Sequence, residues 1–102
     1  MQMLTEENKK YMGKRDDDAK AKAKAKVIKF FVPWSNGSWY VTEGEEESNG
    51  DWLFFGFVVG MEREWGKFRL SELTSVTGPM GLKIERDRLF NTPVTKFSTD
   101  NI

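Results

Sequence analysis

The apolar segment WLFFGFVVG (52–60) limits the fold of this chain more than any other stretch. Side chains alternate between the two faces of a strand, so Leu53 and Phe55 share one face while Trp52 and Phe54 share the other. Both faces would then be apolar, and other parts of the chain must cover each of them. The segment is much shorter than the ~20 residues of a membrane-spanning helix. It therefore predicts a central strand in a layered domain.

Further segments have the composition of strands. They are rich in β-branched and aromatic residues and cover residues 27–34, 39–43, 64–70 and 82–86. Between the first two, Asn36-Gly37 is the strongest short signal for a hairpin. An acidic loop is expected at 44–51, and in the last strand Leu82 and Ile84 are expected to face inward. Because the connections are short, we expect the strands to pair antiparallel.

Several segments predict short helices. LTEENKKYM (4–12) has Thr5 as a capping residue and two glutamates in the first turn, where the helix dipole favours them. In the segment 91–97, Thr92 is a cap and Pro93 stands at the first helical position. The other expected helices cover 16–26, which is low in complexity, and 71–76.

The order of these elements predicts the α+β class. The length of 102 residues suits a single domain. We expect a curved antiparallel sheet of about five strands, flanked by two to four short helices. A helical, Lys-rich N-terminal arm (1–26) would precede an α+β core domain (27–102).

Charge is distributed unevenly, although the net charge is zero. Residues 1–29 hold nine basic and five acidic residues, and residues 30–102 hold seven basic and eleven acidic ones, which gives +4 and −4. A nucleic-acid-binding domain usually has a basic folded face, so no direct binding of duplex DNA is expected. The alternating Ala and Lys of 20–26 are either a solvated helix or linker, or a basic arm that contacts phosphates or an acidic partner.

The composition removes several kinds of chemistry. The chain has no Cys and no His, which excludes disulfides, zinc–thiolate sites, Cys nucleophiles and the commonest general base. The first residues lack the apolar region of a signal peptide, so a cytoplasmic location is expected. In the segment IERD (84–87), Glu85 and Asp87 could hold a metal ion or serve as acid and base, but ion pairing and capping are the favoured interpretation. We predict no catalytic residue, no cofactor and no metal.

A partner-binding surface is the favoured use of the remaining conspicuous residues. Alternation along 64–70 turns Phe68 and Leu70 toward the core and the other side chains outward. Tryptophan and arginine are frequent in binding hot spots, although such a mixture of side chains can also stack nucleic-acid bases. The predicted partner-binding residues are Trp65, Lys67 and Arg69, together with Glu45, Glu46 and Glu47 in the acidic loop.

The succession of motifs resembles a known family. The most specific part reads FRLSEL…GPMGLKIERD, at residues 68–73 and 78–87, and the likeness extends over 3–97. The chain resembles an uncharacterised family of small bacterial proteins that occurs largely on plasmids, conjugative elements and phages, often near anti-restriction genes. The resemblance implies a compact α+β fold and an origin in a mobile element. No catalytic residues are known for that family, so it implies no reaction.

Three hypotheses of function follow. The first is a non-enzymatic protein that binds and inhibits a host defence protein, such as a CRISPR nuclease complex or a restriction enzyme, by stoichiometric contact. Its partner would be a nucleic-acid-binding effector, which an acidic body attracts. The second is a small-ligand sponge for a nucleotide signal, which needs Arg and aromatic side chains in one pocket. The third is a nucleic-acid-binding accessory protein that uses the Lys-rich arm.

Overall fold

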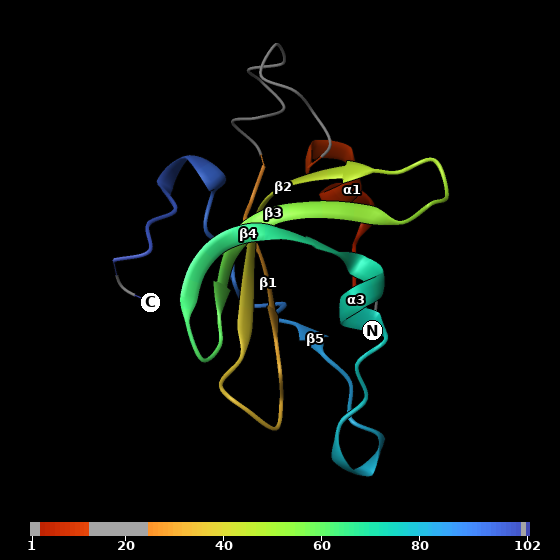
Figure 1. The fold of residues 1–102 in the computed structure, drawn as a ribbon. Coiled ribbons are helices and arrows are strands. Elements are labelled where there is room, and N and C mark those ends of the chain that lie inside the picture. Colours follow the sequence, from red (N-terminus) through yellow and green to blue (C-terminus); the bar gives the residue numbers. More distant parts are fainter. Residues whose placement is uncertain (1–2, 13–24, 101) are drawn as a thin grey trace.

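Five antiparallel strands form one sheet in the order β4-β3-β2-β1-β5 (Figure 1). The computed structural model describes residues 3–12, 25–100 and 102. The strands are β1 (Ile28–Phe31), β2 (Ser38–Glu46), β3 (Trp52–Val59), β4 (Arg63–Arg69) and β5 (Glu85–Arg86). The helices are α1 (Glu6–Met12) and α3 (Leu70–Thr74), and two 3-10 turns are η1 (Pro79–Gly81) and η2 (Val94–Lys96).

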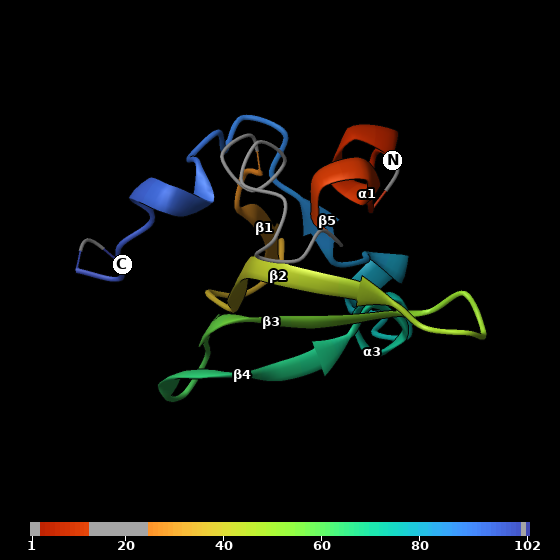
Figure 2. The same cartoon turned by 90° about the horizontal axis from the view of Figure 1, so that it is seen from above.

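Helix α1 begins as its sequence predicts. The backbone N–H of Asn8 donates to the Thr5 hydroxyl at 3.0 Å, and the Asn8 side chain accepts the N–H of Thr5 at 3.0 Å. This reciprocal pair satisfies two backbone donors at the helix start. At the other end, Met12 is buried against β2, where a Cβ at Gly44 would lie 2.7 Å from its side chain. Figure 2 shows α1 lying along β2.

Strand β2 is longer than expected, because it includes the first part of the predicted acidic loop. Glu45 and Glu46 pair with the start of β3, and the turn itself is confined to residues 47–51. Side chains alternate along β2, so Glu43 and Glu45 lie on the face opposite to Gly44, which faces α1; Glu46 lies on the face of Gly44 and is exposed as well. A bulge at Thr42 shifts the register within β2. The acidic residues in this segment therefore indicate exposure to solvent, and they do not indicate where the strand ends.

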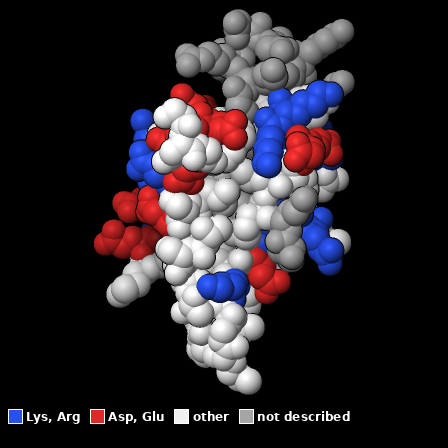
Figure 3. All heavy atoms as spheres, turned by 90° about the vertical axis from the view of Figure 1, so that its right-hand side faces the viewer, with Lys and Arg blue, Asp and Glu red and all other residues white. Residues whose placement is uncertain are grey.

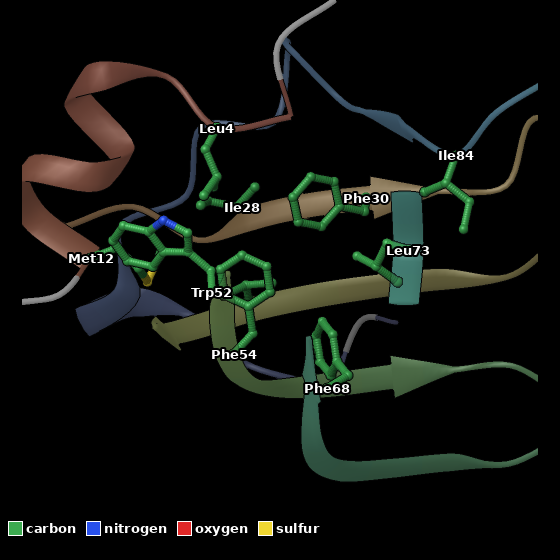
Figure 4. Packing of buried hydrophobic residues seen from close by; sticks show 10 residues of the cluster. Leu4, Met12, Ile28, Phe30, Trp52, Phe54, Phe68, Leu73 and Ile84 are labelled. Carbon is green, nitrogen blue, oxygen red and sulfur yellow. The ribbon is translucent and has the colours of Figure 1, made fainter. Parts of the chain in front are cut away.

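The main hydrophobic core lies on one face of the sheet, beneath α1 and α3 (Figure 4). Phe54, at the centre, contacts the rings of Phe30 at 6.0 Å and Phe68 at 5.8 Å between ring centroids. Leu70 packs against this cluster, so Phe68 and Leu70 face inward as predicted. The buried members are Leu4, Met12, Ile28, Phe30, Val41, Trp52, Phe54, Phe68, Leu73 and Ile84.

A second, smaller cluster lies on the opposite face. Its buried members are Val27, Tyr40 and Phe57, and four side chains from the C-terminal segment pack over them: Phe90, Val94, Phe97 and Ile102. Backbone hydrogen bonds join Val27 to Thr92 at 2.9 Å and Val94 to Ala25 at 3.0 Å, which fasten this segment beside β1. Both faces of β3 therefore contact apolar side chains, as the apolar run predicts.

The α+β class is confirmed, but the helical content is lower than expected. Within the described residues there are two α-helices, and neither is long and apolar enough to cross a membrane. The segment 91–97 forms only the 3-10 turn η2, with Pro93 before it instead of inside it. The predicted last strand is reduced to β5; Ile84 is buried as expected, but Leu82 is exposed. Most of the expected helix at 16–26 lies outside the described residues.

Candidate protein-binding surface

The face of the sheet that carries the second cluster contains most of the predicted binding residues. Strand register aligns three rows of side chains across β2, β3 and β4 on this face. The rows are Tyr40–Phe57–Trp65, Glu43–Phe55–Lys67 and Glu45–Leu53–Arg69. Lys67 and Arg69 thus lie on the same face as Trp65, as alternation along the sequence predicts.

The C-terminal segment covers only the first of these rows. Phe97 contacts the rings of Tyr40 at 5.7 Å and Trp65 at 6.1 Å. In both Figure 1 and Figure 2 this segment lies at the opposite end of the sheet from α3. The other two rows, which end near α3, are partly exposed. We call them, with Trp65 at their border, the open half-sheet: Glu43, Glu45, Leu53, Phe55, Trp65, Lys67 and Arg69.

Trp65 is held firmly although 46% of its surface is exposed. Its indole stacks on Phe55 with 5.6 Å between centroids and 15° between planes, and it meets Phe57 edge-on at 5.4 Å. With Phe97 on a third side, the ring has little freedom to turn. A large side chain that is already ordered loses little conformational entropy when a partner binds.

One ion pair links the predicted binding residues of β4 to those of the acidic segment. The Arg69 guanidinium donates from Nε to Glu47 Oε1 at 2.8 Å and from Nη2 to Oε2 at 3.2 Å. This two-pronged contact raises the pKa of Arg69. Glu45 shares the face of Arg69, whereas Glu46 pairs with Trp52 in the register and points to the other face. The structure therefore brings together five of the six predicted residues and separates Glu46 from them.

Asp51 fixes the end of this surface, and sequence reasoning did not single it out. Its carboxylate accepts hydrogen bonds from the Trp52 N–H at 2.8 Å, the Ser71 N–H at 3.1 Å and the Ser71 hydroxyl at 2.6 Å. The hydroxyl bond, followed by the backbone bonds and the positive charge of Arg69, lowers the pKa of Asp51. The carboxylate thus ties the turn before β3 to the first turn of α3. Only a three-dimensional arrangement could have paired Asp51 with Ser71.

A family model that describes a protein of unknown function (DUF2958) matches residues 3–99. The chain belongs to the DUF2958 family. This confirms the resemblance recognised in the sequence, over nearly the same residues. No curated protein and no solved structure matches the DUF2958 chain.

The most specific motif of the DUF2958 resemblance is structural in this chain. Phe68 and Leu73 belong to the main core, as does Ile84. Gly78 lies against the ring of Trp34, since a Cβ there would be 2.5 Å from the indole. Asp87 accepts the Leu89 N–H at 3.0 Å and pairs with Lys29 at 3.9 Å. The predicted ion pairing and capping at IERD are confirmed for Asp87.

The DUF2958 chain also has a small cavity away from the open half-sheet. Its volume is about 200 Å³, and it lies between α1 and the segment 86–91. Three cations and two carboxylates contribute to its lining, and Tyr11 and Phe90 supply aromatic rings; the charged residues are Lys26, Arg86, Arg88, Glu7 and Asp87. Among the described residues, no group of three or more acidic side chains is placed to hold a metal ion.

Proposed function

We propose that this protein is a non-enzymatic inhibitor that binds a host defence protein through the open half-sheet. The observation that carries the proposal is the register of two exposed rows, each with an apolar residue on β3 between a glutamate on β2 and a cation on β4. An ordered, half-exposed tryptophan borders them. Interface cores are enriched in aromatic side chains and arginine, with polar groups around them.

The nature of the partner follows from charge and from the family. Residues 30–102 carry −4, and an acidic body accelerates encounter with a basic, nucleic-acid-binding protein. A CRISPR nuclease complex and a restriction enzyme are partners of this kind. The plasmid or phage setting implied by the resemblance supports an anti-defence role, which would be exercised in the cytoplasm.

The proposal is tested by titrating the purified protein into CRISPR nuclease and restriction assays. Inhibition should be complete near one molecule per target. Lys67→Glu should weaken inhibition at least about tenfold, because it reverses a charge on the exposed surface. Lys96→Glu is the matched control, since it makes the same charge reversal at an exposed residue of η2, outside the open half-sheet. Equal inhibition by both variants would place the contact elsewhere. Inhibition far below one molecule per target would point to catalysis.

A second candidate function is the binding of a small anionic ligand, such as a nucleotide signal. The cavity beside α1 supports it, because three cations, which outnumber the two carboxylates of Glu7 and Asp87, and two aromatic rings line one space. Phosphate groups favour arginine, and nucleobases stack on aromatic rings. Its volume is below that of most ligand pockets, which begin at about 300 Å³.

Calorimetric titration with mononucleotides and cyclic dinucleotides tests this second function. Binding should be lost in Arg88→Gln, whereas the exposed Arg63→Gln, which lies on β4, should bind like the parent protein. An absence of heat with every nucleotide removes the second candidate and leaves the first unaffected.

A further inference from the structure

In the part of the chain that the structure describes, one end of the molecule carries no charge, although 31% of all residues are charged. The end is built from two loops, residues 32–37 between β1 and β2 and residues 76–82 after α3, and neither contains Asp, Glu, Lys or Arg. The two loops meet where Trp34 packs on Gly78. We call these residues the uncharged tip. Figure 3 shows the lower end of the molecule as an almost wholly white projection.

The loop 76–82 is a defined finger. Thr77 and Lys83 form an antiparallel bridge at its base, and the Lys83 ammonium donates to the Thr77 hydroxyl. The Gly78 N–H donates to the Leu82 carbonyl at 2.8 Å. Gly81 has a φ of +77°, a conformation that glycine adopts without steric cost. These contacts fix the position of the residues between them.

Met80 stands at the end of this finger in an unusual state. Its φ of 57° lies in the left-handed region, which is unfavourable for a residue with a Cβ. Its exposure is 101%, so no contact within the chain offsets the strain. Val76 and Leu82 beside it are also exposed apolar residues. Strained residues of this kind cluster at binding sites, and apolar groups gathered at a surface mark interaction sites.

We infer that the uncharged tip inserts into an uncharged, apolar pocket on the protein partner, with Met80 as the anchor. The inference rests on the proposed function, because that function supplies a protein partner. The tip is convex and therefore fits a concave surface. It offers no charge to pair with, so a charged pocket would lose hydration without compensation. Methionine is flexible and polarisable, and it fills irregular apolar pockets well.

The tip follows the open half-sheet closely along the chain. Strand β4 ends at Arg69, helix α3 has only five residues, and the loop 76–82 comes just after it (Figure 1). A lipid membrane is a poorer occupant, because insertion at a membrane surface is usually supported by several basic residues, and residues 30–102 carry −4. A second copy of the chain would meet the same few apolar side chains, which is a small area for a stable dimer.

The test compares two fully exposed methionines. Met80→Ser removes the anchor, and Met61→Ser is the matched control, because Met61 is equally exposed but lies in a charged turn between β3 and β4. The probe is the host protein that the parent chain inhibits, in purified form. Met80→Ser should weaken its binding at least about tenfold and Met61→Ser should leave it unchanged. Met80→Gly should weaken binding equally while the melting temperature stays level or rises, because glycine relieves the strain at this φ.

Each other outcome overturns the inference in an identifiable way. If Lys67→Glu loses binding but Met80→Ser does not, the tip is not part of the contact, and the proposed function still holds. If no host protein is bound or inhibited by the parent chain, both fail. Two further measurements on the parent and on Met80→Ser identify a different occupant. These are sedimentation with vesicles of phosphatidylcholine, with or without phosphatidylglycerol, and the molar mass in solution. Lipid binding or a dimer that is lost in Met80→Ser would contradict a pocket on a host protein.

Discussion

Gly56 is the residue at which the sheet tolerates least change. A Cβ at this position would lie 2.0 Å from the Tyr40 carbonyl oxygen and 2.9 Å from Val41 Cα, beside the bulge of β2. Backbone atoms cannot move aside without breaking the pairing of β2 with β3. We therefore expect Gly56→Ala to lower the free energy of unfolding by about 3 kcal/mol or more. Urea denaturation measures it.

Gly66→Ala on β4 is the control for this prediction. Nothing lies within 4 Å of a Cβ at Gly66, and its φ is not in the left-handed region. This variant should be as stable as the parent or slightly more stable. Similar losses in both variants would show that close approach is not the reason for glycine at position 56.

Asp51 makes stability depend on pH. Its pKa in the folded protein is below the ordinary value of 3.8, mainly because the Ser71 hydroxyl donates to the carboxylate. A depressed folded pKa contributes stability that is present above the ordinary value and is lost as pH falls through the folded pKa. The urea midpoint of the parent should therefore fall from pH 5 to pH 2.5. Asp51→Asn should have a lower midpoint at pH 7 and a smaller decline. Asp100→Asn, at an exposed aspartate, is the control. If the urea midpoint of Asp51→Asn declined with pH as steeply as that of Asp100→Asn, the result would contradict this prediction.

At the scale of elements, the Arg69–Glu47 pair joins β4 to the turn between β2 and β3. The side chains are 47% and 28% exposed, so water and salt weaken their attraction. A double-mutant cycle with Arg69→Ala and Glu47→Ala should give only a small coupling free energy, which 0.5 M salt reduces further. A large coupling that salt does not reduce would mean that the pair is a main support of the sheet edge.

The C-terminal segment should behave as a removable cover of the second cluster. Phe97→Ala would remove the ring that contacts Tyr40 and Trp65. We expect a loss of about 1–2 kcal/mol in the free energy of unfolding, since Phe97 is only partly buried. Acrylamide quenching of tryptophan fluorescence should increase, because Trp65 becomes more accessible. Lys96→Ala, an exposed neighbour, should change neither quantity.

The elements that sequence reasoning identified were those with local signals. Alternation placed Phe68 inward and Trp65 outward, and Thr5 marked the start of α1. The sequence predicted a loop at Glu46 because charged residues indicate exposure. The exposed end of a strand has the same composition as a loop. Leu82 was expected inside because alternation continues through it, but the finger holds it away from the sheet.

The features that the sequence did not predict are those that depend on contacts between distant parts of the chain. The Arg69–Glu47 contact joins two strands, and no pattern in either strand indicates it. The uncharged tip combines two loops that are far apart in sequence. Each loop alone has the composition of an ordinary turn, and only the contact of Trp34 with Gly78 in the folded chain joins them into one surface.

For the molecule as a whole, the charge distribution predicts that the protein does not bind duplex DNA. Neutralising phosphates requires a cluster of cations, and residues 30–102 carry −4. A fluorescence anisotropy titration at 150 mM salt should show no binding at micromolar protein. Micromolar, salt-sensitive binding that disappears when Lys20, Lys22, Lys24 and Lys26 become Gln would contradict this, and it would favour the nucleic-acid hypothesis.

The strand order has a consequence for the time course of folding. β1, β2, β3 and β4 follow one another in the chain and pair as neighbours, so they can associate after closing only short loops. The chain then leaves β4 at one edge of the sheet, passes through α3 and the finger, and pairs as β5 with β1 at the other edge of that meander. The entropic cost of such a distant pairing is lower once Leu73 and Ile84 have ordered the intervening segment in the core. The four-stranded meander is thus the natural nucleus, and β5 completes the sheet last.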